Sequence, residues 1–169
     1  IDEYHEIVSA SDSDLYLRPD PDTLCVVPWA SDPTVQIIHD CFTHDGTPHE
    51  LAPRSVLRRV IARYDALGLK PIIALEFFLV QKNTDPDFPL QPPVGRNGRP
   101  ETARQSYSID AVNEFDPIID LMYDYCESME LDVETLIHES GAAQLEINFR
   151  HADPLSRADQ VFLFKRTVR

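Results

Sequence analysis

Positive charge and cysteine are scarce in this chain of 169 residues, and it has no long apolar run. Lys and Arg number 15 against 29 Asp and Glu, and the resulting charge of −14 disfavours a nucleic-acid partner or an anionic membrane surface. Without a run of about 18 apolar residues, no transmembrane helix is expected. The three cysteines form no CxxC pair, which favours reduced thiols and a cytoplasmic protein.

Several signature motifs are also missing. The sequence has no P-loop, no GxGxxG, no HExxH and no GxSxG elbow, so any ATP site must be of another kind. Glycine is scarce, with five residues against fourteen prolines, which predicts stiff connections and prolines at helix starts. Hydrophobic residues make up 43% of the chain, enough to form a packed core.

The pattern of runs and breaks predicts two parts with a boundary near residue 52. Residues 1–52 are expected to form a small β-rich unit, with a turn at Asp45-Gly46. Residues 53–169 are expected to form an α+β domain with a mixed or antiparallel sheet. Its expected elements are a helix over 53–68, a strand over 71–80 buried on both faces, a proline-rich loop over 82–104, a helix over 110–129, two strands within 131–150 and a helix starting at Asp153-Pro154.

One apolar stripe marks the clearest helix. It comprises Val112, Phe115, Ile119, Met122, Cys126 and Met129, at alternating spacings of three and four. This stripe is typical of a helix face packed on a core. Cys126 is therefore expected to be a core thiol rather than a nucleophile.

Three glutamates lie where carboxylates are unusual. Glu76 interrupts the apolar run 71–80, Glu146 lies on the polar face of the alternating segment 143–149, and Glu139 ends the segment 136–139. If these segments are neighbouring strands with aligned polar faces, the carboxylates converge, and a cluster of this kind is neutralised best by Mg²⁺ or Mn²⁺. The residues alone equally allow three solvated glutamates on the open face of a half-buried sheet.

The segments around these glutamates resemble the glutamine synthetase family. The resemblance lies in Pro71-Ile-Ile-Ala-Leu-Glu-Phe-Phe-Leu79, in His138-Glu-Ser-Gly-Ala-Ala-Gln-Leu-Glu-Ile-Asn-Phe149 and in Ala158-Asp-Gln-Val161. Upstream, Ser13-Asp-Leu-Tyr-Leu-Arg-Pro-Asp20 resembles the family's N-terminal β-grasp domain. The stretch 144–169 is most similar to the branch that ligates glutamate to polyamines, the γ-glutamylputrescine synthetases.

The resemblance implies a two-step ligase reaction with ATP and a divalent metal. ATP phosphorylates the γ-carboxylate of glutamate, and ammonia or an amine then displaces the phosphate to form an amide. It also implies a homo-oligomeric ring with active sites between subunits. The residues that match family positions are Glu76, Glu139 and Glu146 as metal ligands, Glu134 at the nucleotide, Tyr107 beside the amine and Asp14 near a neighbouring subunit's site.

Two residues depart from the family pattern. Ala74 stands where the family has a second carboxylate, which puts the second metal site in doubt, and Ala143 stands where the family usually has glycine. The chain is also shorter than family enzymes, so it resembles a partial chain with an incomplete β-grasp unit and an incomplete catalytic domain. We therefore expect 169 residues alone to lack ligase activity. The alternative is a catalytically dead paralogue or truncated product that acts as a binding or assembly module.

Overall fold

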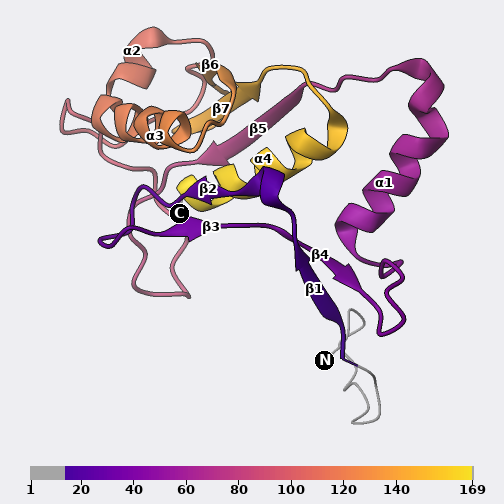
Figure 1. The fold of residues 1–169 in the computed structure, drawn as a ribbon. Helices are drawn as coiled ribbons and strands as arrows, with labels where there is room; N and C mark the ends of the chain where they lie inside the picture. The colour runs from indigo at the N-terminus through magenta and orange to yellow at the C-terminus, as the bar shows by residue number, and fades with distance from the viewer. Residues whose placement is uncertain (1–13, 169) are drawn as a thin grey trace. The chain divides into compact units, whose positions relative to one another are not determined.

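A computed structural model describes residues 14–168, which divide into two compact units. The first contains residues 14–25 and 35–68, and the second contains residues 26–34 and 69–168. Figure 1 labels the helices and strands of both units. Part of the β-rich segment predicted over 1–52 lies outside the described residues, and the boundary predicted near residue 52 stays a prediction.

The first unit is built on a short antiparallel ribbon and one helix. Strand β1 pairs with β4, with Tyr16 opposite Phe42. The Asp45-Gly46 turn is confirmed, with Gly46 at a φ of +83° where glycine is favoured. Its elements are β1 (Tyr16–Pro19), η1 (Pro21–Thr23), β3 (Val35–Gln36), β4 (His39–Phe42), α1 (Pro53–Tyr64) and η2 (Asp65–Leu67), and β2 (Cys25–Val26) spans the division between the units.

The helix predicted over 53–68 is confirmed at both ends. Pro53 occupies the first turn of α1, where its missing N–H has no helical partner to lose. The following turn η2 ends at Gly68, whose φ of +58° is the left-handed conformation that glycine adopts without strain. Proline at the start and glycine past the end thus set the limits of this segment.

Ion pairs tie α1 to the ribbon of the first unit. Arg54 binds Asp20 at 2.6 Å and Asp40 at 2.7 Å. Arg58 grips both carboxylate oxygens of Asp40, at 2.7 and 2.8 Å. This paired geometry gives a stronger contact than a single exposed ion pair. The hydrogen bond from Arg58 holds the pKa of Asp40 below its ordinary value, partial burial opposes that shift, and the Arg54 charge adds to it.

The second unit contains an antiparallel sheet of three strands in the order β5-β7-β6. The strands are β5 (Ile73–Phe78), β6 (Val133–His138) and β7 (Gln144–Phe149). This arrangement confirms the α+β class and the antiparallel sheet. Because β7 lies in the middle, its residues face β5 on one side and β6 on the other, with Glu146 opposite both Glu76 and Ile137.

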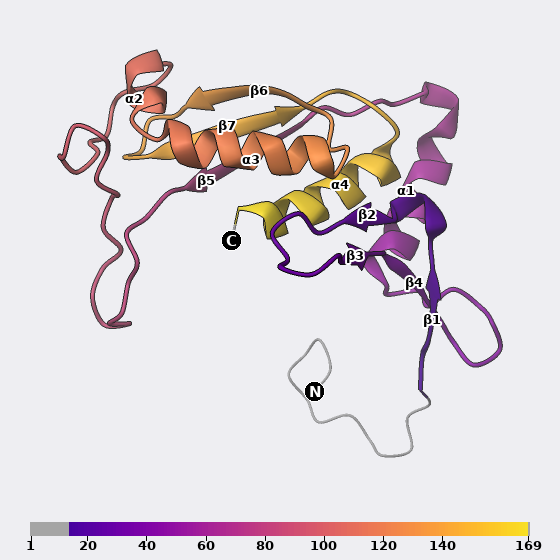
Figure 2. The same ribbon diagram turned by 60° about the vertical axis from the view of Figure 1, so that its left-hand side comes forward.

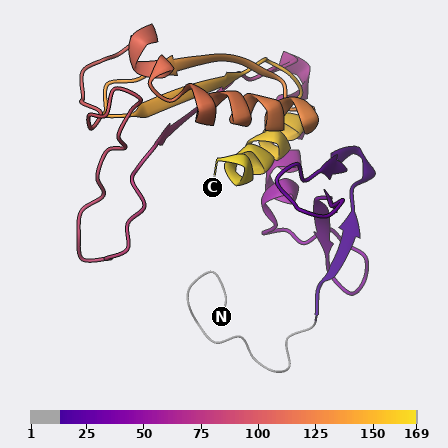
Figure 3. The same ribbon diagram turned by 90° about the vertical axis from the view of Figure 1, so that its left-hand side faces the viewer.

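Two helices cover one face of this sheet, as Figures 2 and 3 show from different sides. They are α3 (Asp116–Ser128) and α4 (Pro154–Thr167). Leu145, Ile147 and Phe149 of β7 point into this side and are fully buried. The Phe164 ring of α4 packs edge-on against Phe149, with ring centres 5.5 Å apart. The apolar residues of the sheet therefore form a core with the helices.

The continuous apolar run predicted that strand β5 is buried on both faces. This prediction is wrong, because only one face of β5 is covered. Its residues alternate, with Ile73, Leu75 and Phe77 half-buried and Ala74, Glu76 and Phe78 exposed. Within the described residues, the helices cover only one side of the sheet. A continuous apolar run does not reveal how many sides of its strand are covered.

The helix predicted over 110–129 is two helices instead of one. Helix α2 (Ile109–Asn113) ends before Phe115, and α3 starts afresh at Asp116 with Pro117 in its first turn. Proline lacks the N–H that a continuous helix would need at that point, so the chain breaks there. The predicted stripe nevertheless packs as expected, because Phe115, Ile119, Met122, Cys126 and Met129 are buried and Val112 packs against the core.

The predicted helix cap at Asp153 and the predicted core position of Cys126 are both confirmed. Asp153 caps α4, accepting hydrogen bonds from the N–H groups of Leu155 and Ser156 at 3.0 Å. Burial raises the pKa of the Cys126 thiol to about 12, as suits a core cysteine. No helix within residues 14–168 is long and apolar enough to cross a membrane.

The Asp40 cluster predicts a pH-dependent contribution to stability. Folding lowers the pKa of the Asp40 carboxyl from its ordinary value of 3.8, so the ionised carboxylate stabilises the folded state at pH values above 3.8. This stabilisation is lost as the pH falls through the folded-state pKa. Urea unfolding should therefore show Asp40→Asn to be less stable than wild type at neutral pH, with the difference shrinking in acid. Asp124→Asn, at an exposed position of α3, is the control. A difference that persists unchanged at acid pH would contradict this account.

Candidate active site

The face of the sheet opposite the helices carries the predicted glutamates. Glu76 of β5 and Glu146 of β7 are direct cross-strand partners, so their side chains leave the same face. Cβ atoms of such partners are about 5 Å apart. The residues on this open face are Ala74, Glu76 and Phe78 of β5, Gln144, Glu146 and Asn148 of β7, and Thr135 and Ile137 of β6.

Glu139 adds a third carboxylate at the end of β6. The buried His138 points into the core, so alternation along the strand places Glu139 on the open face. The N–H of Glu139 donates to the Gln144 carbonyl at 2.7 Å, which extends the pairing with β7 by one residue. The three glutamates therefore share one face of the sheet, and their convergence on a common metal site stays a prediction.

The carboxylates themselves are held by neutral amides of β7. The Gln144 side-chain amide donates to Glu76 at 2.6 Å, and the Asn148 amide donates to Glu146 at 2.9 Å. Asn148 also donates to the Thr135 hydroxyl at 3.1 Å. In this arrangement, no three His, Cys, Asp or Glu side chains among residues 14–168 lie close enough together to hold a metal ion.

Among residues 14–168, no positive side chain is paired with the glutamates of this face. None of Glu76, Glu139 and Glu146 forms an ion pair with a Lys or Arg of the described chain. Like charges directly opposite each other on a sheet are destabilising. Carboxylate oxygens without a protein cation are the donor set that suits Mg²⁺ or Mn²⁺. The chemistry of this donor set therefore fits a hard divalent cation.

Tyr107 lies beside the end of β6, in a segment of unusual backbone. We call residues 104–107 the strap. The N–H of Arg104 donates to the Ser140 carbonyl and that of Tyr107 to the His138 carbonyl, both at 2.8 Å. Arg104 and Tyr107 have φ values of +70° and +63°, which are uncommon for residues with side chains and recur at functional sites. The strap thus places Tyr107, which is 74% exposed, next to the strand end that carries Glu139.

Glu134 occupies an irregularity of β6. Val133 pairs with Phe149 and Thr135 pairs with Asn148, so Glu134 is an extra residue that bulges from the ladder. Glu134 is exposed, and its carboxylate is 4.0 Å from the Arg150 guanidinium. Five residues separate it from Glu139, which is about 17 Å along a strand. The structure therefore places Glu134 apart from Glu139.

Asp14 belongs to the first unit and is exposed just before β1. Ala74, where the resemblance implies a family carboxylate, lies on the open face opposite Asn148. Ala143 is fully buried in the apolar cluster with Phe115 and Ile119, and it has a φ of +53°. A glycine would adopt this conformation with less strain, so the departure from the family pattern acts on the backbone and core.

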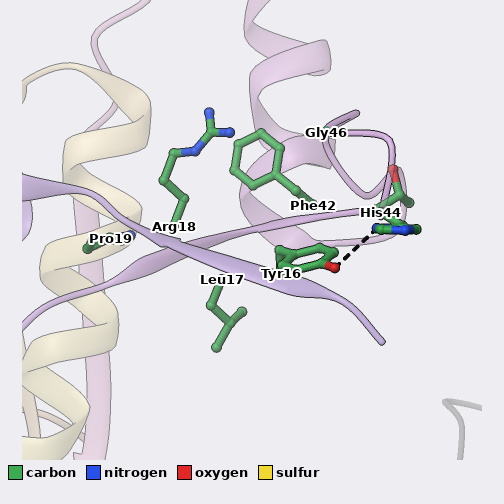
Figure 4. Close-up of a pocket in the computed structure, with 8 residues that line it drawn as sticks. Tyr16, Leu17, Arg18, Pro19, Phe42, His44 and Gly46 are labelled. Atoms are coloured by element: carbon green, nitrogen blue, oxygen red, sulfur yellow. Dashed lines mark hydrogen bonds between the residues drawn. The ribbon is translucent and has the colours of Figure 1, made fainter. Parts of the chain in front are cut away.

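The first unit has a hollow that the sequence did not predict (Figure 4). This pocket of about 400 Å³ lies over β1, β4 and the following turn. The Tyr16 ring stacks on His44 and its hydroxyl lies 3.1 Å from Nδ1, while the Arg18 guanidinium lies 4.0 Å from the Phe42 ring centre. None of the site residues expected from the sequence lines it.

Comparison with known proteins gives the family and fold of this chain. The family model for the catalytic domain of glutamine synthetase matches residues 50–169. A solved structure of GmaS in complex with ADP superposes with a TM-score of 0.71 at 26% identity, covering 95% of this chain and 36% of that chain. The chain belongs to the glutamine synthetase family.

Curated relatives include two kinds of ligase. The glutamine synthetase of Pyrococcus horikoshii is 35% identical over 160 residues, which cover 94% of this chain and 33% of that protein. The γ-glutamylputrescine synthetase of Escherichia coli is 32% identical over 163 residues, covering 89% and 34%. The chain therefore spans about a third of the length of the relatives it matches.

The facing glutamates predict that neutralising one of them stabilises the protein in the absence of metal. In EDTA, Glu146→Gln should raise the free energy of unfolding by about 0.2–1 kcal/mol, because it removes a like-charge pair and keeps the acceptor for Asn148. The gain should shrink at high salt. Urea unfolding measures it, with Glu127→Gln, an exposed residue of α3, as the control. A loss of stability in Glu146→Gln alone would contradict the like-charge interpretation.

Proposed function

We propose that this chain carries the metal-binding part of an ATP-dependent ligase that joins glutamate to ammonia or an amine. The observation that carries the proposal is the cross-strand pair Glu76–Glu146 on an open face, with Glu139 at the adjacent strand end. Membership of the glutamine synthetase family supports the reaction class. The sheet would serve as a rigid platform for charged groups, since its other face is packed against α3 and α4.

Each residue has a role that follows from its place. Glu76, Glu139 and Glu146 would hold Mg²⁺ or Mn²⁺, which supplies charge neutralisation for phosphate groups when it is bound. Tyr107, held by the strap beside Glu139, would form a wall of the amine pocket. Glu134 would contact the nucleotide, and its bulged position directs it independently of the regular ladder. Asp14 would act at the active site of a neighbouring subunit.

The reaction proposed for the whole protein has two balanced steps. The γ-carboxylate of glutamate attacks the terminal phosphorus of ATP, which gives γ-glutamyl phosphate and ADP. The amine nitrogen then attacks the acyl carbon, phosphate leaves, and the nitrogen loses a proton. The relatives named above use different nitrogen donors by their names, so the acceptor is proposed only as ammonia or a small amine such as putrescine.

Assembly and length bear on activity. The relatives are about three times as long as the part matched here. We propose that further residues of the complete protein are needed to complete the active site. We propose that the complete protein forms a homo-oligomeric ring in the cytoplasm. A preparation of the 169 residues alone is expected to show no ligase turnover.

Cation binding tests the proposal directly. In titration calorimetry, Mn²⁺ or Mg²⁺ should bind the wild-type protein, and Glu139→Gln or Glu146→Gln should weaken the affinity at least tenfold, because each removes a negatively charged oxygen donor. Glu127→Gln is the matched control and should bind as wild type does. Cation binding unaffected by both site variants would mean that the glutamates are merely solvated, and the proposal would fail.

A second candidate function is that of a catalytically dead paralogue or truncated product that acts as a binding or assembly module. Ala74 is the observation that favours it, because the open face lacks a carboxylate where the family has one. With a single set of carboxylates, only one cation would be held, and phosphoryl transfer would be impaired.

Restoring that carboxylate separates the two candidates. If the full-length enzyme is already active with one cation, the Ala74→Glu variant should form ADP from ATP, glutamate and amine no faster than wild type does. If the protein is a dead paralogue, Ala74→Glu should raise turnover from background, with assembly unchanged by size-exclusion chromatography. Glu127→Gln again serves as the surface control. Robust wild-type turnover would exclude the dead-paralogue function.

A further inference from the structure

The Gln144 side chain connects the outer strand β5 to the turn between β6 and β7. Its side-chain N–H donates to Glu76 Oε2 on β5 at 2.6 Å. Its side-chain oxygen accepts from the N–H of Gly141 at 2.8 Å, in the turn that leads from β6 to β7. Both polar atoms of the amide are thereby used, so the amide has one orientation, and the side chain cannot turn away without losing two hydrogen bonds.

The turn is shaped to receive this side chain. A Cβ atom on Gly141 would lie 2.7 Å from Gln144 Oε1 and 2.5 Å from the Phe78 ring, closer than atoms normally approach. Phe78 is the cross-strand partner of Gln144, so its ring closes over the same spot. Glycine at 141 is therefore what allows the turn, the amide and the ring to meet.

Glu139 is connected to the same network. Its carboxylate accepts from the N–H of Ser140 at 3.2 Å, and its own N–H donates to the Gln144 carbonyl at 2.7 Å. A continuous path of short contacts thus runs from Glu139 through the turn and Gln144 to Glu76. These two carboxylates lie on strands that do not touch each other, because β7 separates them.

We propose that Gln144 is a positioning residue that holds Glu76 in place relative to Glu139 and thereby sets the affinity of the face for a divalent cation. This inference rests on the proposed function. Gln144 occupies only Oε2 of Glu76, and Oε1 makes no hydrogen bond within residues 14–168. The hydrogen bond from Gln144 restricts the motion of the Glu76 carboxylate before a cation binds. Loss of such a hydrogen-bond partner of a metal ligand generally weakens metal binding about 10–100-fold.

The test compares Gln144→Met with a matched change elsewhere. Methionine has nearly the same length and forms neither hydrogen bond, and Gln91→Met makes the same change at an exposed loop residue that donates to a carbonyl at 3.0 Å. Calorimetry with Mn²⁺ should show at least tenfold weaker binding for Gln144→Met and unchanged binding for Gln91→Met. Urea unfolding in EDTA establishes that both variants are folded.

A spectroscopic readout separates positioning from a purely structural role. The side-chain amide signals of Gln144, assigned by their disappearance in Gln144→Met, should shift during a Mg²⁺ titration with the midpoint seen by calorimetry. Gly141→Ala provides a second variant, since it displaces the amide while leaving Gln144 in place, and it should also weaken Mn²⁺ binding. It keeps the proposal testable if Gln144→Met does not fold.

The outcomes distinguish this inference from the proposed function. The positioning role is overturned if both folded variants bind the cation within twofold of wild type, or if the Gln144 amide signal does not shift with Mg²⁺. Either outcome leaves the proposed function standing. Absence of cation binding by the wild-type protein overturns both. Weakened binding in Gln144→Met with an unchanged control supports the positioning role.

Discussion

The pairing of Glu76 with Glu146 across two neighbouring strands is the constraint on which the chemistry of this chain depends. Two carboxylates at this register repel each other, and within residues 14–168 no lysine or arginine is paired with either. Their present partners are the neutral amides of Gln144 and Asn148. The negative charge of this face is therefore not balanced by a paired cationic side chain of residues 14–168.

The buried face of the sheet stabilises the fold by more than the repulsion between Glu76 and Glu146 costs. Leu145, Ile147 and Phe149 alternate with the polar residues of β7 and are completely buried against the helices. Burial of one such side chain contributes about 1.5–3 kcal/mol, more than the repulsion between a pair of exposed carboxylates. The core thus fixes the register, and the register fixes which carboxylates face each other. A slip by one residue would turn Glu146 of β7 into the core.

Much of this could be predicted from the sequence, because local patterns dictate it. The alternation over 143–149 placed Glu146 on a polar face, and the position of Glu76 within an apolar run marked it as unusual. Their convergence with Glu139 was predicted only on the condition that the strands are neighbours. Long-range features could not be predicted. The open face of β5 depends on what covers the sheet, the bulge at Glu134 depends on pairing with β7, and the strap at 104–107 depends on carbonyls more than thirty residues away. The helix break at Pro117 could have been predicted from the proline, but the continuous apolar stripe favoured one helix over 110–129.

The central claim is that these carboxylates converge on a cation, and anomalous diffraction from crystals grown with Mn²⁺ tests it most directly. The account predicts an anomalous peak on the open face, within about 2.0–2.6 Å of oxygens from Glu76, Glu139 and Glu146. A protein crystallised in saturating Mn²⁺ with no peak on this face would contradict it.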